Sequence, residues 1–216
     1  MKFNTITFCA AILLIACNDD TGKTAEPKVA SASTTTPTQQ VPDAQPDSAT
    51  MRKNREIYMT PGEAHKLMAS WEGSWSGEVT MWMSPDAPPT KSALTAVNKM
   101  VLGGRYQQTT VKGKFNNMPF EGMSTLAYDN AKKVYQSTWI DNMGTGLMVS
   151  QGPWDAATKS ITFVGRMIDP TTHKEMDFKQ IVKPIDNNYY VSEMYAPGPG
   201  GQDFKTMEIK YTRKTK

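Results

Sequence analysis

The chain has 216 residues, a net charge of +3, 38% hydrophobic residues and two cysteines. This charge is too small to indicate nucleic-acid binding, and the length suits one domain with a core of its own. No apolar run reaches the roughly 20 residues that a membrane-spanning helix needs.

The first 16 residues have the pattern of a secretory signal peptide. Lys2 gives a short positive start, the apolar run Phe8–Ile15 follows, and Ala16 is a small residue at the cleavage position. The alternative is a buried N-terminal strand or helix, but a polar stretch follows at once. We therefore expect residues 1–16 to be a lipoprotein signal peptide that is removed.

Leu14–Cys17 resembles a bacterial lipobox, the signal for acylation of a cysteine sulfur and for cleavage directly before it. The resemblance implies that Cys17 carries acyl chains such as palmitate and holds the mature protein to a membrane. Because each buried CH₂ contributes about 0.8 kcal/mol, two or three chains make a lasting anchor. We expect a location in the cell envelope, with the outer membrane favoured and the side of that membrane left open.

Residues 17–57 are expected to form a disordered tether between the anchor and a folded domain over residues 58–216. The tether is rich in Thr, Ser, Ala, Pro and Gln, so burial cannot offset the entropy of ordering it. Its most polar part, from Asn18 to about Thr50, is a flexible chain of roughly 33 residues and spans about 30 Å on average. Because Cys9 and Cys17 are the two cysteines, the domain has no disulfide and no cysteine metal site.

A short helix is predicted to begin at Thr60, which would act as the N-cap. Pro61 suits the first turn, and Glu63 would complete a capping box. Gly73 would end the helix. Apolar residues occur at helical spacing between these limits: Ala64, Leu67, Met68 and Trp71.

The rest of the chain is predicted to form β-strands, because apolar and polar residues alternate along it, most clearly in residues 176–182 and 207–213. Turn-forming segments separate the runs: Leu102–Arg105, Asp129–Asn130, Asp141–Gly144, Asp155–Thr158, Asp169–Thr172 and Asp186–Asn188. About ten strands fit between Ser76 and Lys214. This pattern predicts an all-β fold, an antiparallel up-and-down meander closed into a barrel, with a short N-terminal helix.

Gly73-Ser74-Trp75 opens the first predicted strand, and Arg213 lies near the end of the last one. Gly-x-Trp in this place, after a short helix and before a meander, resembles the lipocalin and fatty-acid-binding superfamily. The resemblance implies a lipocalin-like barrel in which Trp75 plugs one end and Arg213 packs across its ring. A desolvated cation over an indole face contributes about 2 kcal/mol.

A closer resemblance covers residues 63–214 and is to the bacterial domain-of-unknown-function family 1579. Its supporting segments are Gly73–Trp75, Leu102–Tyr106, Phe120–Gly122, Tyr128–Asp129, Trp139–Asp141 and Met207–Lys214. The resemblance implies the barrel fold and, in many members, association with the envelope. It brings no established activity with it.

The sequence carries no recognisable metal or catalytic motif. His65 on the predicted helix and His173 in a predicted turn are interpreted as surface residues that do not meet, and no cysteine remains to complete a metal site. There is no Gly-x-Ser-x-Gly elbow and no nucleophilic cysteine. We expect no metal and no cofactor.

Methionine gives the main indication of a binding function, since many of the 15 methionines fall in predicted strands. Thioether side chains suit walls that accept varied apolar shapes, and ordinary core packing is the alternative interpretation. The residues expected to line a cavity are Met81, Met83, Met176, Phe178, Tyr189, Glu193 and Met207.

Three functions stay open at this point. The first is binding of a small apolar or amphipathic ligand inside the barrel. The second is a scaffold or adaptor that binds an envelope protein through its outer surface, with a filled barrel and an exposed apolar patch. The third is an enzyme, which would need Glu193, Tyr189 and Tyr195 as a polar cluster inside the barrel. The identity of a ligand or protein partner stays open.

Overall fold

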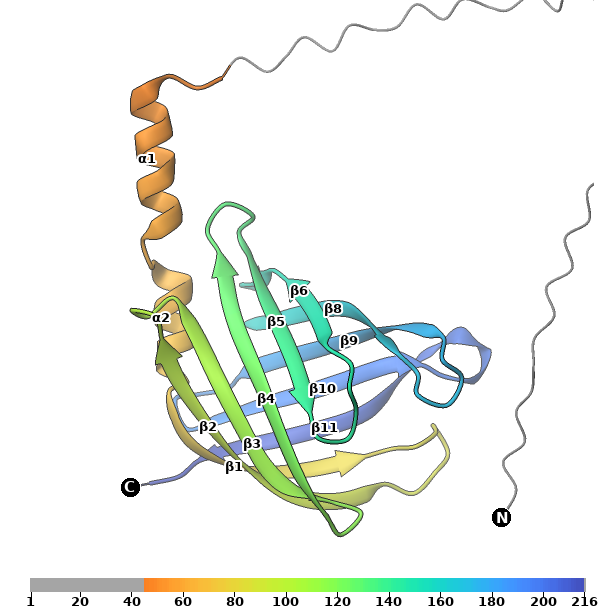
Figure 1. Ribbon diagram of the computed structural model, residues 1–216. Helices are drawn as coiled ribbons and strands as arrows, with labels where there is room; N and C mark the ends of the chain where they lie inside the picture. The colour runs from red at the N-terminus through yellow and green to blue at the C-terminus, as the bar shows by residue number, and fades with distance from the viewer. Residues whose placement is uncertain (1–44, 216) are drawn as a thin grey trace, which may run out of the picture. The chain divides into compact units, whose positions relative to one another are not determined.

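Residues 45–215 are described by a computed structural model, and most of them lie in β-strands (Figure 1). Helices α1 (Ser48–Met59) and α2 (Glu63–Ser70) come first, and a 3₁₀ turn, η1 (Pro199–Gly201), precedes the last strand. The strands are β1 (Gly73–Met81), β2 (Thr90–Val101), β3 (Tyr106–Phe115), β4 (Met118–Asp129), β5 (Val134–Asp141), β6 (Met148–Gly152), β7 (Trp154–Asp155), β8 (Ser160–Ile168), β9 (Glu175–Pro184), β10 (Tyr189–Pro197) and β11 (Asp203–Arg213).

Within residues 45–215, ten strands form one closed antiparallel barrel, and the two-residue β7 pairs with β8 beside it. Neighbours in sequence pair with one another, β1 pairs with β11, and a β6–β8 ladder closes the ring. The predicted fold class, an up-and-down meander of about ten strands, is therefore confirmed. Closure pairs the strand edges that would otherwise be open to another chain.

The β6–β8 ladder depends on Gly152, which lets two backbones approach closely. A Cβ at this position would lie 1.9 Å from the carbonyl oxygen of Thr162. Any larger residue would therefore push β6 away from β8.

Five of the six predicted turns are built by aspartates that accept a hydrogen bond from the backbone N–H two residues further on. The acceptors are Asp129, Asp141, Asp155, Asp169 and Asp186, at distances of 2.7–2.9 Å. This local bond stabilises the turn without help from the rest of the fold, which explains why the sequence pattern located these turns.

Helix α2 covers one end of the barrel, which we call the closed pole (Figure 1). Its start differs from the prediction, because Gly62 and not Thr60 is the N-cap. The side chain of His65 accepts the Gly62 N–H at 3.0 Å, in the role assigned to Glu63. The helix ends at Ser70, while Gly73 has a φ of 128° and begins β1.

Helix α1 was not predicted, and it occupies the last part of the segment that the sequence assigned to the disordered tether. Asp47 caps it by accepting the N–H groups of Ala49 and Thr50. Its C-terminal carbonyls accept hydrogen bonds from Asn130 and Arg105 in two turns of the barrel. None of its residues is buried, so hydrophobic periodicity could not reveal it.

No helix within residues 45–215 has the length and apolar character needed to span a bilayer. The predicted signal peptide, Cys17 and most of the predicted tether lie outside the described residues.

Candidate ligand-binding cavity

The closed pole brings Trp75 and Arg213 together. They are register partners on β1 and β11, and the guanidinium carbon lies 4.2 Å from the centre of the fully buried indole. The same guanidinium donates to the carbonyl oxygens of Asn187, Glu72 and Ser70 at 2.7, 2.5 and 2.7 Å. Arg213 therefore ties β11 to the β9–β10 turn and to the end of α2.

Aromatic rings form the floor of the barrel interior above this pair. Tyr190 stacks on Tyr211 with centroids 4.3 Å apart, and it meets Trp75 edge-on at 4.7 Å. Burial raises the pKa of both tyrosines well above 10. Asn98 donates to the carbonyl of Trp71 at 3.0 Å, so polar groups here are bonded within the protein.

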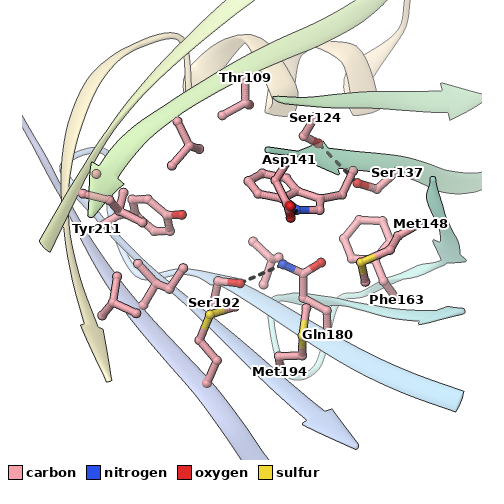
Figure 2. Close-up of a pocket in the computed structure, with 18 of the residues that line it drawn as sticks. Thr109, Ser124, Ser137, Asp141, Met148, Phe163, Gln180, Ser192, Met194 and Tyr211 are labelled. Carbon is pink, nitrogen blue, oxygen red and sulfur yellow. Dashed lines mark hydrogen bonds between the residues drawn. The ribbon is translucent and has the colours of Figure 1, made fainter. Parts of the chain in front are cut away.

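A cavity of about 430 Å³ extends from this floor toward the opposite end of the barrel, the mouth, where β1 stops at Met81 and β5 at Asp141. Its walls are mostly apolar, and Figure 2 shows side chains from several strands pointing into the same space. The methionines that line it are Met81, Met143, Met148, Met167, Met194 and Met207. Met143 is both a lining residue and half exposed, so the cavity opens near it.

Two polar pairs interrupt the apolar walls (Figure 2). Gln180 of β9 donates to the Ser192 hydroxyl of β10 at 2.9 Å. The hydroxyls of Ser124 and Ser137 lie 3.4 Å apart on β4 and β5. Each pair satisfies one bond internally and keeps further acceptor or donor capacity, so a ligand can add hydrogen bonds without breaking the existing ones.

Among the described residues that line the cavity, Asp141 and Lys114 are the two charged ones. Lys114 is exposed at the rim, whereas Asp141 is half-buried and its side chain points inward (Figure 2). No described arginine or lysine reaches the deeper walls. The interior therefore lacks a cation that could hold an anionic head group.

Three of the predicted cavity residues, Met81, Phe178 and Met207, line the cavity, and four do not. Met83 is 76% exposed in the loop after β1, beyond the point where strand alternation applies. Met176 shares a strand face with Phe178 but is not part of the lining.

Tyr189 and Glu193 were predicted to face inward, and this prediction is wrong. On β10 the inward residues are Tyr190, Ser192 and Met194. Alternation shows which residues share a face, but it does not show which face is inside. The polar cluster on which the enzyme hypothesis depended therefore lies on the outer wall.

On the outer wall Glu193 forms an ion cluster with Lys205 and Lys183, and Lys205 also bonds Glu208 at 2.8 Å. The Glu193 side chain is only 12% exposed. Burial alone would raise the pKa of Glu193, but the two ammonium groups outweigh it and lower that pKa below its ordinary value. This cluster stabilises the pairing of β9, β10 and β11.

The two histidines differ from each other. His65 is buried, which corrects its interpretation as a surface residue; its ring caps α2 and meets Tyr128 edge-on at 5.9 Å. Burial and the nearby Arg105 lower the pKa of His65. His173 is exposed in the β8–β9 turn. Within residues 45–215 no three metal-ligating side chains gather.

Sequence reasoning missed Asp141, Gln180 and Ser192 as cavity residues. Gln180 lies on the same predicted face as Phe178 and Val182, so the alternation pattern could have predicted that its side chain faces the cavity. Asp141 was noticed as a turn residue and as the end of the Trp139–Asp141 segment, and Ser192 is a single small polar residue between Tyr190 and Met194 on its strand face. Neither carried a signal of its own.

A closed antiparallel barrel with an internal cavity is thus the class of structure that this chain forms. A family model described as "Protein of unknown function (DUF1579)" matches residues 60–213, and the chain belongs to this family. A search of curated proteins finds no match.

The chain is similar to several solved structures, including the following two. The crystal structure of Rv2717c from M. tuberculosis has a TM-score of 0.52 at 13% identity, covering 72% of this chain and 100% of that one. The S-type phycobiliprotein lyase CPES from Guillardia theta has a TM-score of 0.47 at 9% identity, covering 75% and 97%. The likeness to Rv2717c shows the fold alone.

Proposed function

We propose that this protein is an envelope lipoprotein that binds one small amphipathic molecule inside its barrel. The observation that carries the proposal is the cavity of about 430 Å³, which lies within the ordinary size range of ligand sites. Mostly apolar walls would stabilise a hydrocarbon body through burial. The Gln180–Ser192 and Ser124–Ser137 pairs would hydrogen-bond a polar part of the same molecule.

The membrane part of the proposal rests on the sequence. The signal-peptide pattern and the lipobox-like Leu14–Cys17 support an acyl anchor on Cys17. An anchored binding protein would meet amphipathic molecules at the membrane surface, where they are concentrated. Replacing Cys17 by Ala should leave the precursor uncleaved and without acyl chains, so the acylated mature form should disappear from the mass spectrum of the protein from producing cells.

An adaptor function is the second candidate, and one observation favours it. Four apolar side chains are exposed on neighbouring strands β4, β5, β6 and β8 of the outer wall. They are Met123, Ile140, Val149 and Val164. Such a patch fits a protein contact, although it leaves the hollow interior without a role.

Native mass spectrometry of protein purified from envelopes tests the leading proposal. Wild type should carry a small bound molecule, and Val111→Phe, which fills the cavity from β3, should not. Val164→Phe adds the same ring on the exposed outer wall and should behave as wild type. An unliganded wild type, with crosslinks from Val164 to a partner protein, would favour the adaptor function instead.

A further inference from the structure

One corner of the cavity mouth has a defined structure that the binding proposal does not use. Two segments that carry the family resemblance, Phe120–Gly122 and Trp139–Asp141, pair directly there, with Gly122 opposite Asp141 on β4 and β5. Phe120, Trp139 and Asp141 all line the cavity. The pairing therefore places two aromatic rings and one carboxylate at the same part of the wall.

Gly122 lets the Trp139 ring lie flat against β4. A Cβ on this glycine would come within 2.4 Å of the indole. In this position the indole is close to parallel with Phe120, with centroids 6.3 Å apart and an interplanar angle of 20°. Both near-parallel rings border the cavity.

The same indole orients the carboxylate. Trp139 Nε1 donates to Asp141 Oδ2 at 2.7 Å, and the backbone N–H of Met143 donates to Oδ1 at 2.9 Å. Asn142 fixes the chain behind it through hydrogen bonds with the backbones of Glu121 and Pro119. Each Asp141 oxygen has one protein donor and keeps acceptor capacity for a ligand.

Asp141 differs from the other turn aspartates in where its charge lies. Asp129, Asp155, Asp169 and Asp186 make the same local turn bond, but none of them lines the cavity. Asp141 is half-buried among apolar groups, and the one other charged lining residue, Lys114, is exposed at the rim. A negative charge in a partly apolar site attracts a cation more strongly than one in water does.

We propose that this corner binds the positively charged head group of the ligand, a protonated amine or a quaternary ammonium. The carboxylate supplies the opposite charge, and the faces of Trp139 and Phe120 supply cation–π attraction. The hydrocarbon part then extends along the apolar wall toward the floor. This inference rests on the proposed function and names the class of ligand, a cationic amphiphile.

Three probes of equal chain length separate the charge preference from simple cavity binding. Dodecylammonium and dodecanoate, below their micelle concentrations, and dodecan-1-ol, below its solubility limit, are titrated into the folded chain, with displacement of a neutral naphthylamine dye as the readout. We expect dodecylammonium to bind at least tenfold more tightly than the alcohol and dodecanoate to bind most weakly.

Asp141→Asn should bring dodecylammonium to within about twofold of dodecan-1-ol without weakening the alcohol. Asp186→Asn removes the same charge from the same kind of turn at the closed pole, and its preference should match wild type. Phe120→Leu, which leaves both Asp141 hydrogen bonds intact, should reduce only the ammonium preference. This variant serves as the second test if Asp141→Asn unfolds.

The outcomes distinguish the two proposals. Alcohol binding without an ammonium preference, or a preference that survives Asp141→Asn, overturns the head-group assignment and leaves the binding function standing. Absence of saturable dye binding, with none of the three probes bound, contradicts the binding function itself.

Discussion

The closed pole and the mouth of this barrel are built from the same strands, yet they differ in how completely their groups are paired. At the pole, one arginine donates to three carbonyls and covers a fully buried indole. Toward the mouth, the walls enclose about 430 Å³ that the protein's own side chains do not fill. The closed pole therefore supplies much of the stability of the fold, so the barrel can keep an unfilled cavity toward the mouth.

The comparison predicts the largest loss of stability at the pole. Trp75→Ala should lower the free energy of unfolding by about 3–5 kcal/mol, because it removes a large side chain from a site that cannot collapse. Urea denaturation measures this change. Met83→Ala at the mouth is the control and should change stability by less than about 0.5 kcal/mol, since that side chain is mostly exposed. Equal losses of unfolding free energy in the two variants would contradict the claim that the closed pole stabilises the fold more than the mouth does.

Arg213→Ala should cost about 2–4 kcal/mol, because three carbonyl bonds and the ring contact are lost together. Arg213→Lys keeps the charge over Trp75 but cannot reach three acceptors with a planar fork, so an intermediate loss is expected. Thermal melting of the two variants beside wild type gives the order. A lysine variant as stable as wild type would show that charge alone matters.

The ion cluster on the outer wall should contribute to stability and not to ligand binding. Glu193→Gln should lower the free energy of unfolding by about 1–3 kcal/mol, since it breaks a mostly buried ion cluster, while ligand binding is unchanged. Because the pKa values of Glu193 and Glu208 are lowered in the folded state, their contribution is present above about pH 4.5 and is lost as the pH falls. The variant should therefore lose less stability than wild type on acidification. Weaker ligand binding by Glu193→Gln would contradict the placement of Glu193 outside the binding site.

The smallest effect is expected for the floor tyrosines at neutral pH. Burial raises the pKa of Tyr211 above 10, and it raises the pKa of Tyr135, a buried residue of β5 outside the floor, to about 12. Both side chains therefore stay neutral in the folded chain at pH values where the unfolded chain ionises. The contribution of these tyrosines to the free energy of unfolding is thus present below pH 10 and is lost as the pH rises further. Tyr211→Phe should melt close to wild type at pH 7 and above it at pH 11. Identical alkaline melting curves would contradict this account.

The sequence predicted the strands and turns well because their causes are local. Alternation follows from strand geometry, and each turn aspartate bonds the backbone two residues away. The Trp75–Arg213 pair was expected from a family resemblance and not from periodicity. These features need little information from distant parts of the chain.

Other features depended on distant contacts, and sequence reasoning missed them. Helix α1 buries no residue, and its last carbonyls are bonded by Asn130 and Arg105, far along the chain. Glu193 was assigned to the wrong face because alternation does not distinguish inside from outside. Asp141 points into the cavity in a wall where Gly122 leaves room for Trp139, which no single-residue pattern reveals.

The central claim is that the hollow end of the barrel is a binding site. Titration of a neutral naphthylamine dye into wild type and Val111→Phe, with Val164→Phe as the control, tests it most directly. Saturable one-to-one binding that weakens at least tenfold in Val111→Phe and is unchanged in Val164→Phe is the predicted result. Absence of saturable binding, or equal binding by both variants, would contradict it.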